Sequence, residues 1–272
     1  MTRLLSTFLL GLIALSISGC VTKTAQKEAE KRKLDKQKQP KSEQQLFDEA
    51  RVHFAIGKYG KAAELTGQVI EKSPDDPRYQ ILLADIRFIR GDVPGAIEAY
   101  DEVIRLKPDF KARLWQRGLA LYYAGEFEKG KEQFESHQTV NSTDVENAVW
   151  HLLCNAKFSD LETARKEMIP IEGDTRIPMT EIYEIFAGRM NPDQAVTTSA
   201  DSTNIQTALY FAFLYNGLYY EMIGETDKSL DSIEKATKAM SSAAKDNLMN
   251  QLAAIHLKLR TENQTPNVDS KK

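Results

Sequence analysis

A repeat of 34 residues is the feature that most restricts how this chain folds. Sliding the sequence against itself brings glycines, small residues and prolines into the same phase in successive copies. The repeated positions are Gly57, Gly91 and Gly125, then Ala62, Ala96 and Gly130, then Pro74 and Pro108. Fixed periods of this length are typical of proteins in which one supersecondary unit stacks on the next.

The chemistry of these positions predicts a helical hairpin in each copy. A glycine ends the first helix in the left-handed conformation, and a small residue five positions later lets two helices approach closely. A proline then ends the second helix, while Asp76-Pro77 supplies a cap and a first-turn proline for the next one. We therefore expect helical hairpins over 43–76, 77–110 and 111–144, and the scarcity of β-branched runs excludes an all-β fold.

These three copies resemble the tetratricopeptide repeat. The resemblance implies an all-α fold, an α-solenoid whose first helices line a concave groove through repeat positions 2, 5, 9 and 12. The candidate partner-binding residues there are Phe47, Arg51, Phe54, Arg78, Asp85, Phe88, Trp115 and Tyr122. Aromatic residues and arginine are typical anchors of protein interfaces. The sequence leaves three alternatives: an open groove, one filled by residues 145–205, or one covered by a second copy.

The remainder of the chain is expected to stay helical. Residues 145–205 form a degenerate helical segment that opens with a capping box from Thr143 to Glu146 and includes a polar loop from Thr197 to Asn204. The repeat pattern returns over 206–260 as a hairpin similar to the tetratricopeptide repeat, followed by a capping helix from about Ser242 to Arg260. Residues 261–272 read as a disordered tail.

The N-terminus reads as a lipoprotein signal peptide over residues 1–19. Arg3 precedes an apolar run that is shorter than the ~20 residues of a membrane-spanning helix. The run closes with Ile17-Ser18-Gly19-Cys20, which resembles the bacterial lipobox and implies a covalent lipid on Cys20. Val21 follows where an aspartate would favour the inner membrane, so this resemblance favours the periplasmic face of the outer membrane.

A basic tether follows the lipidated cysteine, over residues 20–42. Residues 21–45 hold eight basic and four acidic residues, whereas residues 46–272 hold 27 basic and 35 acidic residues. The tether is either a solvated linker or a segment drawn to anionic lipid head groups or cell-wall polymer. The net charge of −3 argues against a nucleic-acid partner.

No pattern of catalytic residues emerges. His151 and Cys154 are three residues apart on a predicted helix, but no second pair completes a four-ligand zinc set, so Cys154 is expected to be a small core residue. Phosphate-binding loops, nucleophile elbows and metalloprotease helices do not occur in the sequence. We therefore expect a non-enzymatic protein without a metal or a cofactor other than the lipid.

The order of these parts, together with Arg117 to Tyr123 in the third repeat, resembles the NlpI-type lipoproteins of the bacterial envelope. Glu181 to Ala195 and Tyr210 to Ala236 are similar as well. The resemblance implies a scaffold for other envelope proteins, namely murein hydrolases and a periplasmic processing protease, and a homodimer. The alternative is a structural lipoprotein, one subunit of a larger envelope or secretion complex.

Overall fold

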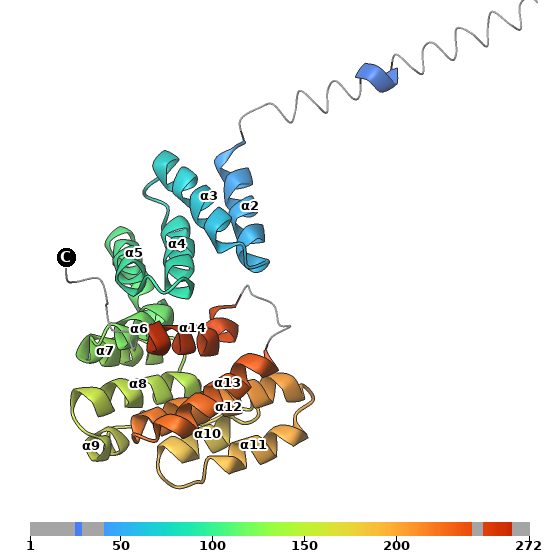
Figure 1. Cartoon of the computed structure of the whole chain (residues 1–272). Helices are drawn as coiled ribbons and strands as arrows, with labels where there is room; N and C mark the ends of the chain where they lie inside the picture. The colour runs from blue at the N-terminus through green and yellow to red at the C-terminus, as the bar shows by residue number, and fades with distance from the viewer. Residues whose placement is uncertain (1–24, 29–40, 241–246, 263–272) are drawn as a thin grey trace, which may run out of the picture. The chain divides into compact units, whose positions relative to one another are not determined.

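The computed structural model describes residues 25–28, 41–240 and 247–262 (Figure 1). The chain divides into two units, Met1–Ser42 and Glu43–Lys272. In the first, residues 25–28 are helical. The signal peptide, Cys20, most of the tether and most of the tail lie outside the described residues. In the described part all regular structure is helical, which confirms the predicted all-α array.

Three antiparallel helical hairpins open the second unit, in the predicted phase. Neighbouring hairpins stack through the contacts of α3 with α4 and of α5 with α6. Their helices are α2 (Glu43–Ala55), α3 (Tyr59–Lys72), α4 (Pro77–Ile89), α5 (Val93–Leu106), α6 (Trp115–Tyr123) and α7 (Phe127–Gln138).

The residues that begin and end the helices act as the sequence predicts. Gly57, Gly91 and Gly125 have φ values of 74°, 85° and 78°, in the left-handed region that a side chain disfavours. Asp76 caps α4 by accepting a hydrogen bond from the Arg78 N–H, and Pro77 occupies the first turn. Each hairpin therefore turns where its glycine lies.

The third hairpin departs from the first two at its start. A 3-10 helix, η1 (Pro108–Arg113), precedes α6 and shortens it. Gly118 in α6 lies beneath the ring of Phe134 in α7, and a Cβ at Gly118 would stand 2.6 Å from Phe134 Cζ. The two helices can thus pack closely only because position 118 has no side chain.

Five short elements make up the degenerate segment. They are α8 (Val145–Phe158), α9 (Leu161–Lys166), α10 (Met179–Phe186), α11 (Asp193–Thr198) and η2 (Ser199–Asp201). The capping residue of α8 is Asp144, whose Oδ1 accepts from the Glu146 N–H at 3.1 Å, and not Thr143 as expected. The expected loop from Thr197 is helical as far as Asp201, because Ser199 is buried and its hydroxyl donates to the Ala195 carbonyl.

A fourth hairpin and a last helix complete the unit. The hairpin is α12 (Ile205–Met222) and α13 (Thr226–Ala239), with Gly224 at a φ of 84° between them. The last helix, α14 (Leu248–Glu262), continues two residues past the predicted end at Arg260. No helix within residues 25–28, 41–240 and 247–262 combines the length and apolar character that crossing a membrane requires.

The buried side chains form two clusters. The smaller joins α2, α3 and α4 around Phe47, Leu65 and Tyr79. The larger runs from α4 to α14 and holds Phe88, Tyr122, Trp150 and residues of every later α-helix. The third repeat, the degenerate segment and the C-terminal helices therefore share one core.

Candidate partner-binding surface

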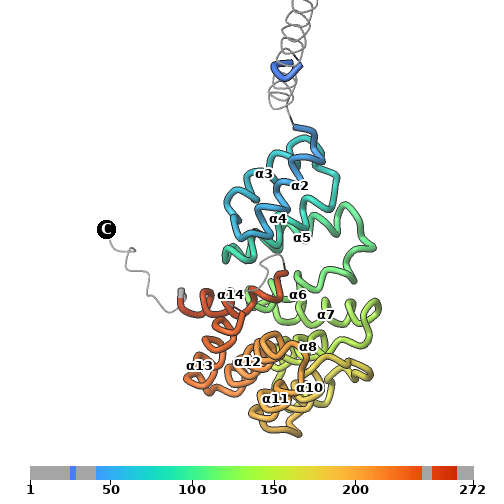
Figure 2. Tube along the Cα trace, turned by 90° about the vertical axis from the view of Figure 1, so that its right-hand side faces the viewer, coloured from blue at the N-terminus to red at the C-terminus, as the bar shows by residue number. Residues whose placement is uncertain are grey.

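The last helix, α14, occupies the middle of the predicted groove. The helix α14 packs against α4 and lies beside α6 (Figures 1 and 2). Phe88 of α4 is fully buried and Tyr122 of α6 is 2% exposed. The expectation of an open groove at these two residues is corrected accordingly. Of the alternatives that the sequence left, helices of the same chain fill the groove. They are α8 of the segment 145–205, whose Trp150 ring lies 5.2 Å from that of Tyr122, and also α14, whose Arg260 lies over the Tyr122 ring.

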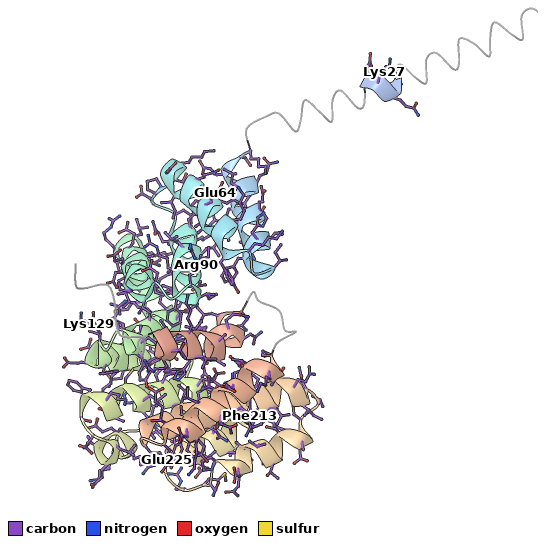
Figure 3. All side chains as sticks on the ribbon, in the orientation of Figure 1. Lys27, Glu64, Arg90, Lys129, Phe213 and Glu225 are labelled. Atoms are coloured by element: carbon purple, nitrogen blue, oxygen red, sulfur yellow. The ribbon has the colours of Figure 1, made fainter. Side chains whose placement is uncertain are left out.

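Polar contacts hold α14 in place at both ends. Near its start, the Tyr210 hydroxyl donates to the Met249 carbonyl. Near its end, the Lys258 ammonium donates to the carbonyl of Arg90, which Figure 3 labels at the end of α4, at 2.6 Å. Because these bonds reach α12 and α4, α14 ties the fourth hairpin to the second.

A charged cluster on α12 and α14 adds to this attachment. Glu221 of α12 accepts from His256 at 2.9 Å and from Arg260 at 2.8 Å. Burial alone would raise the pKa of Glu221, but the bonds and charges of His256 and Arg260 outweigh it and lower that pKa to about 2. The other imidazole nitrogen of His256 lies 2.9 Å from the Tyr123 hydroxyl of α6.

The first repeat places its aromatic groove candidates within the core. Phe47 packs edge-on against Tyr79 with ring centroids 4.8 Å apart, and Phe54 packs in the same way against Tyr59 at 5.7 Å. These contacts bury both phenylalanines between α2, α3 and α4. They stabilise the first hairpin and are not exposed to a partner in this structure.

The charged candidates differ from one another in exposure. Arg51 and Arg78 are exposed, and the Arg78 guanidinium forms an ion pair with Asp76 at 2.6 Å. Asp85 is half-buried and accepts from the Tyr100 hydroxyl at 2.6 Å. Burial raises the pKa of Asp85 to about 7, although the bond from Tyr100 lowers it. Of the three charged candidates, the structure therefore leaves the two arginines, Arg51 and Arg78, on the surface.

Trp115, the remaining candidate, is half-buried and lines a pocket of about 240 Å³. The pocket walls come from α6, α7, α8, α12, the start of α14 and the segment before α10. Its lining residues are Trp115, Phe134, Asp144, Glu146, Asn147, Trp150, Arg176, Phe211, Asn247 and Met249. Concave pockets with aromatic walls and a few polar groups are the usual form of binding sites.

An ionic network around the half-exposed Arg176 side chain forms the polar wall of this pocket. The Arg176 guanidinium lies 2.7 Å from carboxylate oxygens of Asp144, Glu146 and Asp174. The Tyr215 hydroxyl donates to the second oxygen of Glu146 at 2.9 Å. Burial and the charge of Asp144 raise the pKa of Glu146 to about 7, against the opposing effect of Arg176.

His151 and Cys154, the pair considered for zinc, have separate structural partners. His151 Nε2 lies 3.3 Å from Glu135 Oε1, whereas the Cys154 thiol is buried against Gly130. Burial raises the pKa of that thiol. Among the described residues, no three His, Cys, Asp or Glu side chains are grouped to hold a metal ion.

Most residues of this pocket were not predicted from the sequence. Arg176, Phe211 and Met249 lie in separate elements, so no local spacing connects them with Trp115. One signal was available: Glu146 and Trp150 are four residues apart and share a face of one helix. An acid next to an aromatic ring on a helix that is otherwise buried marks a polar site within the core.

Comparison with known proteins agrees with this geometry. The sequence model of the tetratricopeptide repeat matches residues 47–109. A tetratricopeptide repeat protein from Parabacteroides merdae is similar in structure, with a TM-score of 0.51 at 13% identity, over 82% of this chain and 87% of that one. At this identity the likeness concerns the fold. The chain is thus an all-α helical array whose residues 47–109 match the tetratricopeptide repeat.

Two further structures are similar at lower scores. A thermophilic tetratricopeptide-repeat protein from Thermus thermophilus has a TM-score of 0.43 at 17% identity, over 82% of this chain and 100% of that one. MamA from Desulfovibrio magneticus RS-1 has a TM-score of 0.46 at 12% identity, over 74% of this chain and 96% of that one.

Proposed function

We propose that this protein is a lipid-anchored, non-enzymatic scaffold of the bacterial envelope that binds other proteins. The observation that carries the proposal is the in-register repeat array of residues 43–138, to which the tetratricopeptide-repeat match belongs. Proteins built from stacked helical repeats present extended surfaces for binding. The exposed Arg51 and Arg78, together with the pocket at Trp115, supply anchors of the types that interfaces favour.

The location and the partners follow from the sequence resemblances. A lipid on Cys20 would hold the chain at the periplasmic face of the outer membrane, with residues 20–42 as its tether. By their likeness to NlpI-type lipoproteins, the partners would be murein hydrolases and a processing protease, and the scaffold would be a homodimer. One repeat array can bind enzyme and protease together and so raise their effective concentration for each other.

Affinity capture from detergent-solubilised membranes tests the scaffold. We expect the full chain to retain cell-wall enzymes, and Lys36→Ala in the tether to retain them equally. Capture of a stable complex of other lipoproteins or secretins would instead favour the structural-subunit alternative. If the chain and a tagged unrelated lipoprotein retain the same proteins, the scaffold proposal is wrong.

A variant at the pocket refines this test. Removing a central anchor typically costs about 2 kcal/mol or more of binding free energy, roughly thirtyfold in affinity. Trp115→Ala should therefore lose the captured proteins while keeping its melting temperature. If the melting temperature and the binding both fall, Trp115 belongs to the core and the binding surface lies elsewhere on the array.

A further inference from the structure

The pocket at Trp115 is built from elements that are far apart in the sequence. Trp115 comes from α6, Trp150 from α8, Phe211 from α12 and Met249 from α14. Its volume of about 240 Å³ is below the ~300–1,000 Å³ of pockets for drug-sized ligands, so it suits one side chain. Indole and phenyl rings form several of its walls.

One buried polar group of the wall is an acceptor without a donor. Asn147 is 3% exposed, and its Nδ2 donates to the Phe134 carbonyl at 3.1 Å and to Gln138 Oε1 at 2.9 Å. Because both neighbours are acceptors, the amide can only be oriented with its nitrogen toward them. Asn147 Oδ1 then finds no hydrogen-bond partner among the described residues. A donor from a ligand would satisfy it.

The one cation among the lining residues, Arg176, is paired with carboxylates. Arg176 donates from Nε to Asp174, from Nη1 to Glu146, and from Nη2 to Asp144 and Asp174. Three carboxylates thus surround one guanidinium, and the network carries excess negative charge when they are ionised. This charge would repel an anionic ligand, whereas a cation would offset it. The buried Trp150 Nε1–H of the same wall also has no hydrogen-bond partner among the described residues.

We propose that this pocket binds one cationic side chain, a lysine or an arginine, presented by a partner protein. Aromatic walls attract a cation through their π-faces, while Glu146 and Asn147 offer acceptor oxygens to its N–H groups. The net charge of the chain is complementary to that of a basic partner. Residues 46–272 hold 35 acidic and 27 basic residues, and this excess of negative charge favours the approach of such a partner. This inference rests on the proposed scaffold function and specifies what its pocket recognises.

The pocket has a built-in reporter, because Trp115 and Trp150 are the two tryptophans of the whole chain. Intrinsic fluorescence and the two indole N–H resonances of the full chain in detergent therefore report on this pocket. The probes are lysine, norleucine and glutamate, each with acetylated N-terminus and amidated C-terminus. We expect lysine to bind at least about fivefold more tightly than norleucine, and glutamate to leave both signals unchanged.

Two conservative variants separate the contributions of charge and ring. Glu146→Gln keeps the shape of the side chain and should remove the preference for lysine over norleucine. Phe211→Leu keeps an apolar wall and should weaken lysine binding while norleucine binding stays the same. The melting temperature of each variant is measured alongside, and if Glu146→Gln is unstable, Phe211→Leu decides.

The outcomes distinguish this proposal from the scaffold itself. Equal binding of lysine and norleucine would show a merely apolar pocket and overturn the proposal, as would binding of glutamate or no response to any probe. The capture experiment with the full chain can still succeed in each of these cases. If the full chain captures no envelope proteins but its tryptophan signals still respond to lysine, the scaffold proposal is wrong and the pocket proposal stands.

Discussion

Three glycines lie at contacts between neighbouring helices, and each faces a larger side chain. A Cβ on Gly118 or Gly217 would stand 2.6 Å from Phe134 or Ile233, respectively. At Gly130, where the tetratricopeptide repeat prefers alanine, the neighbour is the Cys154 thiol from the degenerate segment, 2.8 Å from such a Cβ. Cys154 occupies the space that an alanine methyl would need.

The contact of Gly130 with Cys154 leads to a prediction about stability. The effect of Gly130→Ala should change sign when the Cys154 thiol is removed. Gly130→Ala gains up to about 1 kcal/mol of helix propensity, but overpacking against the thiol costs about 1–3 kcal/mol. We expect a net loss in the wild-type chain and a neutral or favourable effect in Cys154→Ala. Denaturant titration of the wild type, the two single variants and the double variant gives four free energies of unfolding. Together they give the coupling free energy between positions 130 and 154.

A matched control lies in α3. Gly67 is also within a helix, and a Cβ added there would have no heavy atom within 4 Å. Gly67→Ala should stabilise the protein by up to about 1 kcal/mol in both backgrounds. If Gly130→Ala has the same effect with and without the Cys154 thiol, steric contact between the two is not what keeps position 130 a glycine.

At the scale of helices, the repeat register depends on buried small residues such as Ala96. Ala96 is fully buried in α5, which packs against α4. Ala96→Arg should cost about 1–3 kcal/mol through overpacking, and the buried charge adds to that. The exposed Glu98→Arg on the same helix should change stability little. Thermal denaturation compares the two, and equal melting temperatures would contradict the register.

The attachment of α14 should depend on pH through Glu221. Its pKa is lowered from 4.5 to about 2 in the folded state, which corresponds to about 3 kcal/mol. A lowered pKa means stabilisation that is fully present above about pH 4.5 and is lost as the pH falls toward 2. Glu221→Gln should accordingly speed amide exchange of residues 248–262 at pH 5, with the difference from wild type shrinking near pH 2.5.

An exposed ion pair elsewhere controls for general acid effects. Glu184 forms two hydrogen bonds with Arg189 on the surface, and its pKa is also lowered, chiefly by those bonds. Glu184→Gln should leave the exchange of α14 unchanged at both pH values. Should Glu221→Gln leave it unchanged too, the charged cluster is not what holds this helix.

The hairpins were predictable from the sequence, whereas the final shape of the groove was not. Gly91, Ala96 and Pro108 act through local conformation and contacts between adjacent helices, so their spacing reveals the array. The docking of α14 depends instead on contacts such as that of Tyr123 with His256, which are 133 residues apart. Nothing in the helical periodicity of α14 specifies which face of the array it covers, and the pocket at Trp115 depends on that packing.

For the whole molecule, the proposed function joins an acidic repeat body to a membrane through a basic tether and one cysteine. Of the two cysteines, Cys154 is fully buried in the core and Cys20 is the last residue of the lipobox-like sequence. Each buried CH₂ of an acyl chain contributes ~0.8 kcal/mol to membrane binding, so several chains anchor a protein stably where one is marginal. The body would then depend on Cys20 for its place at the membrane.

Palmitate labelling of cells that express three forms of the chain tests this dependence. We expect label in the wild type and in Cys154→Ala, because the buried thiol is no substrate for lipidation, and none in Cys20→Ser. Fractionation should find the first two in membranes and Cys20→Ser either soluble or unprocessed. Since Cys154→Ala keeps the lipobox and removes the other thiol, it separates loss of the acceptor from loss of any cysteine. Label that persists in Cys20→Ser would refute the lipid anchor and, with it, the assignment to the outer membrane.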